Sequence, residues 1–122
     1  MSMQRYELEA WLGDDHNLTD DQIDDLLGTA AEINERFPDA DDQAECDAAL
    51  TAAYRVLTED AGAVVTDLAA ARSNARAAEV AALAGLQQTA VTLIERGDST
   101  ESGFARQANV DRMTVRKWLG KN

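Results

Sequence analysis

Residues 101–120 read Glu101-Ser-Gly-Phe-Ala-Arg-Gln-Ala-Asn-Val-Asp-Arg-Met-Thr-Val-Arg-Lys-Trp-Leu-Gly120, and this stretch decides how the C-terminal part of the chain folds. Asp111 suits the N-cap of a helix, because its carboxylate can accept a backbone N–H of the first turn. Ser99 or Thr100 can cap a preceding helix in the same way. The stretch therefore predicts two short helices, the second running from Asp111 to Leu119.

These residues, and less specifically the helix before them, resemble the bacterial helix-turn-helix family. Two helices that cross at a steep angle need a small residue where they touch, which Ala105 supplies. The turn between them needs a residue that tolerates the left-handed conformation. The family usually has Gly there, whereas this chain has Asn109, the next most tolerant type. The inward positions then predict a small core of Leu86, Ala90, Leu93, Ile94, Phe104, Ala108, Val110, Val115 and Trp118.

The resemblance implies that the second helix enters the major groove of duplex DNA. The side chains expected to project from its first two turns are Arg112, Met113, Thr114, Arg116 and Lys117. Arg112, Met113 and Arg116 are the predicted base readers. An arginine can hold guanine O6 and N7 together, and Met113 or Thr114 can touch a thymine methyl group.

Phosphate contacts are predicted for Arg106, Lys117 and Lys121, which would orient the protein without selecting a sequence. The N-terminal end of the first motif helix, from Thr100 to Ser102, is also expected to meet a phosphate. This interpretation requires Arg112, Arg116 and Lys117 to point toward the duplex instead of pairing with acidic groups of the chain itself.

The segment from Ala61 to about Arg96 has no proline and predicts a long helix. Its apolar positions alternate steps of four and three residues: Val64, Leu68, Ala71, Ala75, Ala78 and Ala82. This heptad-like seam lets another helix approach closely but buries little area per residue. Two partners fit it about equally: the upstream helices of the same chain, and a second copy of the chain. Gly85 is expected to break or bend the segment, leaving Leu86 to Arg96 as the first helix of the C-terminal unit.

Three helices are predicted further upstream. Met3 to Leu12 forms a short helix, and the next helix begins after Thr19, whose spacing to Gln22 indicates a capping box, and ends at Pro38. The third helix follows the polar stretch Asp39–Gln43. The apolar stripes of the two longer helices are Ile23, Leu26, Leu27, Ala30, Ile33 and Phe37, and Cys46, Ala49, Leu50, Ala53, Tyr54 and Leu57. The short connection predicts an antiparallel hairpin with acidic outer faces.

Charge is distributed unevenly along the chain. The formal net charge of −12 by itself disfavours contact with phosphate groups. Residues 96–122 hold six basic and three acidic side chains, a net charge of +3, so the rest of the chain carries −15. A basic tip on an acidic body is expected where one end binds nucleic acid and the body has another role.

Composition narrows the class of protein. One proline, few aromatic residues and abundant alanine indicate an all-α fold. No uninterrupted apolar run suggests a membrane span and the N-terminus does not look like a signal peptide, so the protein is expected in the cytoplasm with no membrane contact. The single cysteine, Cys46, is consistent with a reducing compartment. The preference for arginine over lysine, with so much alanine, points to a bacterial genome.

An enzyme is not expected, because one histidine and one cysteine supply no convergent catalytic groups. His16 is interpreted as a solvated loop residue. The acidic cluster of Asp39, Asp41, Asp42 and Glu45 lacks the spacing of a calcium-binding loop. We therefore predict no catalytic residue, cofactor or metal ion.

The sequence predicts an acidic helical body at 1–60, a connecting or dimerising helix at 61–85 and a helix-turn-helix domain at 86–122. Its predicted function is sequence-specific DNA binding, as a transcriptional regulator of a bacterium or mobile element. A homodimer is expected, since two motifs on half-sites about 34 Å apart supply more contacts than one. The alternative is a non-catalytic interaction module, in which the acidic body or the C-terminal motif binds another protein.

Overall fold

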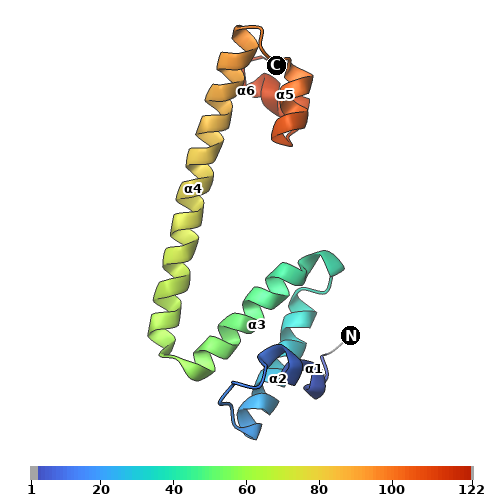
Figure 1. Ribbon diagram of the computed structural model, residues 1–122, viewed down its shortest axis with the longest axis vertical. Coiled ribbons are helices and arrows are strands. Elements are labelled where there is room, and N and C mark those ends of the chain that lie inside the picture. The colour runs from blue at the N-terminus through green and yellow to red at the C-terminus, as the bar shows by residue number, and fades with distance from the viewer. Residues whose placement is uncertain (1–2, 122) are drawn as a thin grey trace. The chain divides into compact units, whose positions relative to one another are not determined.

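The computed structural model describes residues 3–121 (Figure 1). Within that range it contains helices and no strand, which confirms the predicted all-α fold class. The elements are α1 (Arg5–Leu12), α2 (Asp20–Arg36), the 3₁₀ turn η1 (Ala40–Asp42), α3 (Gln43–Thr58), α4 (Ala61–Glu95), α5 (Glu101–Ala108) and α6 (Arg112–Trp118). The chain divides into two compact units between Ala69 and Ala70, inside α4, and each unit has its own hydrophobic core.

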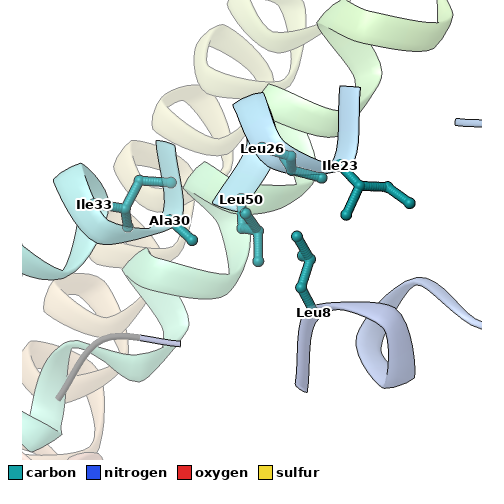
Figure 2. Packing of buried hydrophobic residues seen from close by; sticks show 6 residues of the cluster. All are labelled: Leu8, Ile23, Leu26, Ala30, Ile33 and Leu50. Carbon is teal, nitrogen blue, oxygen red and sulfur yellow. The ribbon is translucent and has the colours of Figure 1, made fainter. Parts of the chain in front are cut away.

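The N-terminal unit is held together by an apolar cluster from α1, α2 and α3. Its buried members are Leu8, Ile23, Leu26, Ala30, Ile33 and Leu50 (Figure 2). The predicted stripes of α2 and α3 are confirmed, because each of their residues is either buried in this cluster or packed against it. The two helices run in opposite directions and pack together, which confirms the predicted hairpin (Figure 1).

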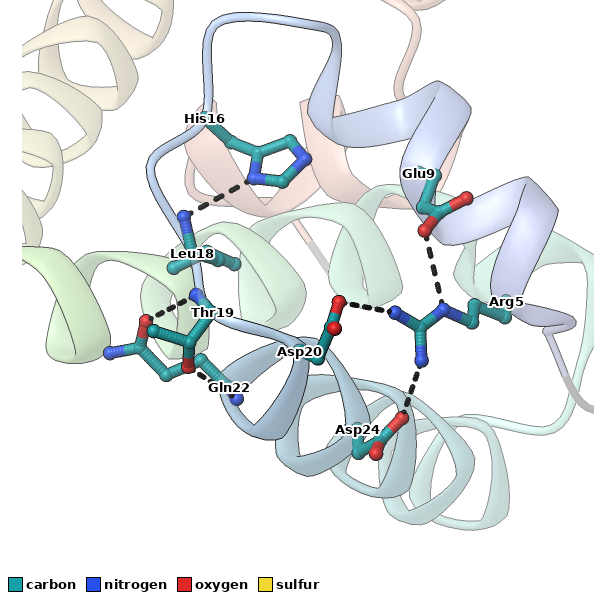
Figure 3. A network of polar contacts seen from close by, with 8 residues as sticks. All are labelled: Arg5, Glu9, His16, Leu18, Thr19, Asp20, Gln22 and Asp24. Atoms are coloured by element: carbon teal, nitrogen blue, oxygen red, sulfur yellow. Dashed lines mark hydrogen bonds and ion pairs between the residues drawn. The ribbon is translucent and has the colours of Figure 1, made fainter.

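Polar contacts fix where α2 begins and how α1 lies against it (Figure 3). The Thr19 hydroxyl accepts the N–H of Gln22 at 3.2 Å, and the Gln22 side chain accepts the N–H of Thr19 at 2.9 Å. The predicted capping box is therefore confirmed. The Arg5 guanidinium donates to Asp20 at 3.0 Å and to Asp24 at 2.9 Å, which ties α1 to the first turns of α2.

The helix α4 is continuous over 35 residues, so the break expected at Gly85 is wrong. One internal glycine costs only about 1 kcal/mol relative to alanine, and the alanine and leucine around it are strong helix formers. The helix begins where the Asp60 carboxylate accepts the N–H of Ala63 at 2.9 Å. It ends at Glu95, and Gly97 follows with a φ of 79°, which favours glycine and turns the chain toward α5.

Most of α4 is exposed. Within the predicted seam Val64 is buried, whereas Leu68 and the four alanines are exposed. By length and composition α4 is also long and apolar enough to cross a membrane, with a mean hydropathy of 1.3 in its most apolar stretch. The helix meets this criterion without an uninterrupted apolar run, because polar and charged residues interrupt its alanines and leucines.

Candidate nucleic-acid interface

Three local features set the ends of α5 and α6. The Thr100 hydroxyl accepts the N–H of Gly103 at 3.0 Å, where α5 begins. The Asp111 carboxylate accepts the N–H of Thr114 at 2.7 Å, where α6 begins, and this hydrogen bond lowers the pKa of Asp111. Asn109 ends α5 with φ 58° and ψ 44°, in the left-handed region. The predicted caps at Thr100 and Asp111 and the left-handed residue at Asn109 are confirmed.

An apolar cluster from α4, α5 and α6 fixes how the two short helices pack. Its buried members are Ala90, Phe104, Ala105 and Val115, and Leu93, Ile94, Ala108, Val110, Trp118 and Leu119 pack around them. The rings of Phe104 and Trp118 meet edge to face, with centroids 6.5 Å apart. Leu86 was expected in this core, but it is 37% exposed, because it lines an open hollow beside Phe104 and Ala108 and is not covered by them.

The opposite side of α6 is the exposed surface of this unit. Val115 is fully buried, whereas Met113, two positions earlier, is 54% exposed. Lys117, two positions later, is exposed and makes no ion pair with any described residue. Thr114 is half-buried at the flank. Met113 and Lys117 are therefore the centre of the surface that α6 turns away from its own core.

Glu101, in the first turn of α5, gathers three basic side chains into a group that we call the Glu101 cluster. The Glu101 carboxylate lies 2.7 Å from Lys121 Nζ, 3.0 Å from Arg116 Nη1 and 3.4 Å from Arg112 Nε. Hydrogen bonds from Lys121 and Arg116 lower the pKa of Glu101 to about 2. The expectation that Arg112 and Arg116 would not pair within the chain is wrong, because the packing of α6 on α5 brings both beside this carboxylate.

The basic members of the Glu101 cluster differ in exposure. The side chains of Arg112 and Lys121 are 62% and 49% exposed, whereas Arg116 is 28% exposed and Glu101 only 14%. One carboxylate faces three cations, so the cluster keeps an excess of two positive charges. Arg112 and Lys121 can therefore meet a second anion from the solvent while Arg116 stays against Glu101.

The other predicted contact residues lie on α5. Ser102 and Arg106 are exposed, and Arg106 makes no ion pair with a described residue. The Thr100 hydroxyl serves as the helix cap. Sequence reasoning missed Glu101, because the contact depends on how two helices cross and helical periodicity carries no sign of it. The acidic residue in the first turn of α5 was visible, but its partners were not.

The residues considered for other chemistry are dispersed. The described residues contain no group of three or more His, Cys, Asp or Glu side chains that could hold a metal ion. The His16 ring accepts the backbone N–H of Leu18 at 3.2 Å through Nδ1 (Figure 3). The half-buried Cys46 thiol lies 3.5 Å from the Phe37 carbonyl oxygen. Both residues thus have local structural contacts in the N-terminal unit.

Comparison of the chain with protein-family models, with curated proteins and with solved structures finds no match in any of the three. Function is therefore inferred from the geometry and charge of α5, α6 and the Glu101 cluster.

Proposed function

We propose that the C-terminal unit binds duplex DNA in a sequence-specific manner, with α6 in the major groove, and that the protein is a transcriptional regulator of a bacterium or mobile element. The observation that carries this proposal is the orientation of α6. Its buried side, at Val115, packs on the core, and its opposite side presents Met113 and Lys117 to solvent. A short helix held in this way can lie in a groove about 12 Å wide.

The exposures suggest a division of roles among the basic side chains. Arg112 and Met113, in the first turn of α6, are placed to reach base edges. Lys117, Lys121 and Arg106 are placed to meet phosphates on either side of the groove. Arg116 is the least exposed of the three arginines of α5 and α6. We propose that Arg116 orients the Glu101 carboxylate in the free protein. It contacts a base only when its ion pair with Glu101 opens.

The proposal is tested by titrating the full chain against labelled duplex DNA over a range of salt concentrations. A protein that releases counterions from phosphates loses affinity with a log–log slope of about −0.9 per contact. Lys117→Ala should weaken binding to all sequences and reduce the slope by about one unit. Arg36→Ala is the matched control, since it removes an exposed positive charge from α2 and should leave binding unchanged.

The alternative is that the surface of α6 and the acidic N-terminal unit bind another protein. The specific observation in its favour is the Glu101 cluster, because ion pairs occupy two of the arginines that a DNA reader would present. Indifference to DNA at low salt would support this alternative and overturn DNA binding. Under either function the protein acts in the cytoplasm, without a cofactor or catalytic step.

A further inference from the structure

The middle of α4 presents an apolar surface to solvent. Every residue from 65 to 86 is exposed. Of the nine large apolar side chains exposed in the described residues, five lie there: Val65, Leu68, Val80, Leu83 and Leu86. Helices in folded proteins owe most of their stability to the packing of an apolar face. A partner is therefore expected along this stretch.

Helix geometry places four of these five side chains on one face. Val65 and Leu83 are 18 residues apart, as are Leu68 and Leu86, and this separation is five full turns of 3.6 residues. Each pair thus occupies the same angular position at the two ends of the exposed stretch. The large apolar side chains of this face therefore lie toward the two ends of the exposed stretch.

The centre of that face is charged. Arg72 lies seven residues after Val65, and Glu79 lies seven residues before Leu86, so both lie close to the line of the apolar pairs. Neither side chain makes a hydrogen bond or ion pair within the described residues. Arg76 stands one turn from Arg72, which places two like charges side by side. In a copy of this face that runs in the opposite direction, the apolar side chains again lie at the ends, and Glu79 lies where the first copy has Arg72.

We infer that a second copy of this chain packs antiparallel along α4, related by a two-fold axis between Ala75 and Arg76. In this register Val65 meets Leu86 of the partner subunit, Leu68 meets Leu83 of the partner subunit, and Arg72 meets Glu79 of the partner subunit. Each contact occurs twice, as an isologous interface requires. The register thus pairs Arg72 with Glu79 twice and covers the apolar ends, while Arg76, one residue from the axis, lies beside its own copy.

A parallel pair is disfavoured by the same charges. It would place Arg72, Arg76 and Glu79 each beside its own copy, which makes three like-charge contacts and no contact between Arg and Glu. The antiparallel register has one like-charge contact, at Arg76, and two contacts between Arg72 and Glu79. Alanine at position 75, next to the axis, lets the two backbones approach closely in the antiparallel pair. Leu86 also borders an apolar hollow lined by Phe104 and Ala108, which leaves room at each end for the partner's Val65.

A lipid bilayer is the other environment that an exposed apolar helix suits. A bilayer that covered the whole exposed stretch from 65 to 86 would also enclose Arg72, Arg76 and Glu79, and each of these charges is costly there unless it is paired or faces water. The observations favour a protein partner with the complementary charge order, which a second copy supplies. The interface does not depend on DNA binding, so its test needs no DNA.

The first experiment reverses charges at the centre of the face. Sedimentation equilibrium of the full chain should show dimers, and Arg72→Glu or Glu79→Arg alone should raise the dimer dissociation constant by about tenfold or more. The double variant restores both contacts and should return the constant to within about threefold of the starting protein. The control Ala70→Glu adds a charge on the opposite side of α4 and should change little.

The second experiment determines the orientation, in a Cys46→Ala background. Chains with Leu68→Cys mixed with chains carrying Leu83→Cys should form a mixed disulfide, whereas Leu68→Cys alone should not cross-link. In the antiparallel pair the two copies of position 68 are about 22 Å apart along the helix, beyond disulfide reach.

Three results would overturn the inference: a monomer at hundreds of micromolar, self-cross-linking of Leu68→Cys, or a double charge variant no better than either single one. Flotation of the monomer with phosphatidylcholine vesicles would assign α4 to the bilayer instead.

Discussion

Asn109 is the one non-glycine residue of the described chain with a positive φ. A left-handed conformation costs an L-residue about 1–2 kcal/mol, and asparagine tolerates it better than most types. Asn109→Gly should therefore leave the free energy of unfolding unchanged or raise it slightly, and Asn109→Val should lower it by about 1–2 kcal/mol. Urea denaturation measures both. Gln107→Gly is the control, because glycine inside α5 should lower the same quantity.

Glu101 predicts a pH dependence for the C-terminal unit. Its pKa is about 2 in the folded protein, below the ordinary value of 4.5, because Lys121 and Arg116 donate hydrogen bonds to the carboxylate. The ionised group thus stabilises the fold above about pH 4.5, and this contribution is lost as the pH falls toward 2. Glu101→Gln should lower the thermal midpoint at neutral pH, and the difference from the unchanged chain should shrink between about pH 4.5 and 2.

The matched control for that experiment is Glu32→Gln, which removes an exposed carboxylate of α2 that has no hydrogen bond or ion pair in the described residues. Its thermal midpoint should follow that of the unchanged chain at every pH. A constant offset for Glu101→Gln across the whole range would show that the ion pairs do not contribute and would contradict the prediction.

At the scale of elements, the features set by neighbouring residues could be predicted from sequence. The Thr19 cap, the left-handed residue at Asn109 and the stripe ending at Phe37 each depend on side chains within one or two helical turns. The break at Gly85 could not, because the intrinsic cost of one glycine is smaller than the summed preference of its neighbours. The pairing of Arg116 depends on the crossing of two helices, which local patterns do not encode.

The two sides of α6 should respond differently to truncation. Val115 is fully buried, so Val115→Ala should lower the free energy of unfolding of the C-terminal unit by about 2 kcal/mol. Met113 is 54% exposed, so Met113→Ala should change it by less than about 0.5 kcal/mol while altering sequence preference in DNA binding. The unfolding of the C-terminal unit can be measured by Trp118 fluorescence in a Trp11→Phe background, which removes the signal of the other tryptophan. Equal destabilisation by both changes would contradict the assigned orientation of α6.

At the scale of the whole molecule, the distribution of charge is more informative than its total. The net charge of −12 would suggest a protein that avoids nucleic acid, yet the residues from Arg96 onward carry an excess of positive charge. A strongly acidic body tethered to a basic tip opposes DNA over distances set by the Debye length. In the proposed complex the acidic N-terminal unit repels the DNA phosphates, so the C-terminal unit must bind the duplex more tightly. Orientations that bring the acidic unit close to the duplex are disfavoured.

This repulsion can be measured by neutralising four aspartates of the N-terminal unit. Asp14, Asp15 and Asp41 are exposed and Asp42 is half-buried, and none of the four makes a side-chain hydrogen bond or ion pair in the described residues. Changing all four to asparagine should strengthen DNA binding at about 10 mM salt, where the Debye length is about 30 Å, and have little effect at about 150 mM, where it is about 8 Å. Changing the same four to glutamate keeps the charge and should leave affinity unchanged at both concentrations. An equal gain for asparagine and glutamate would indicate a change in the structure of the N-terminal unit, and no gain at low salt would mean that the body does not act on the DNA through its charge.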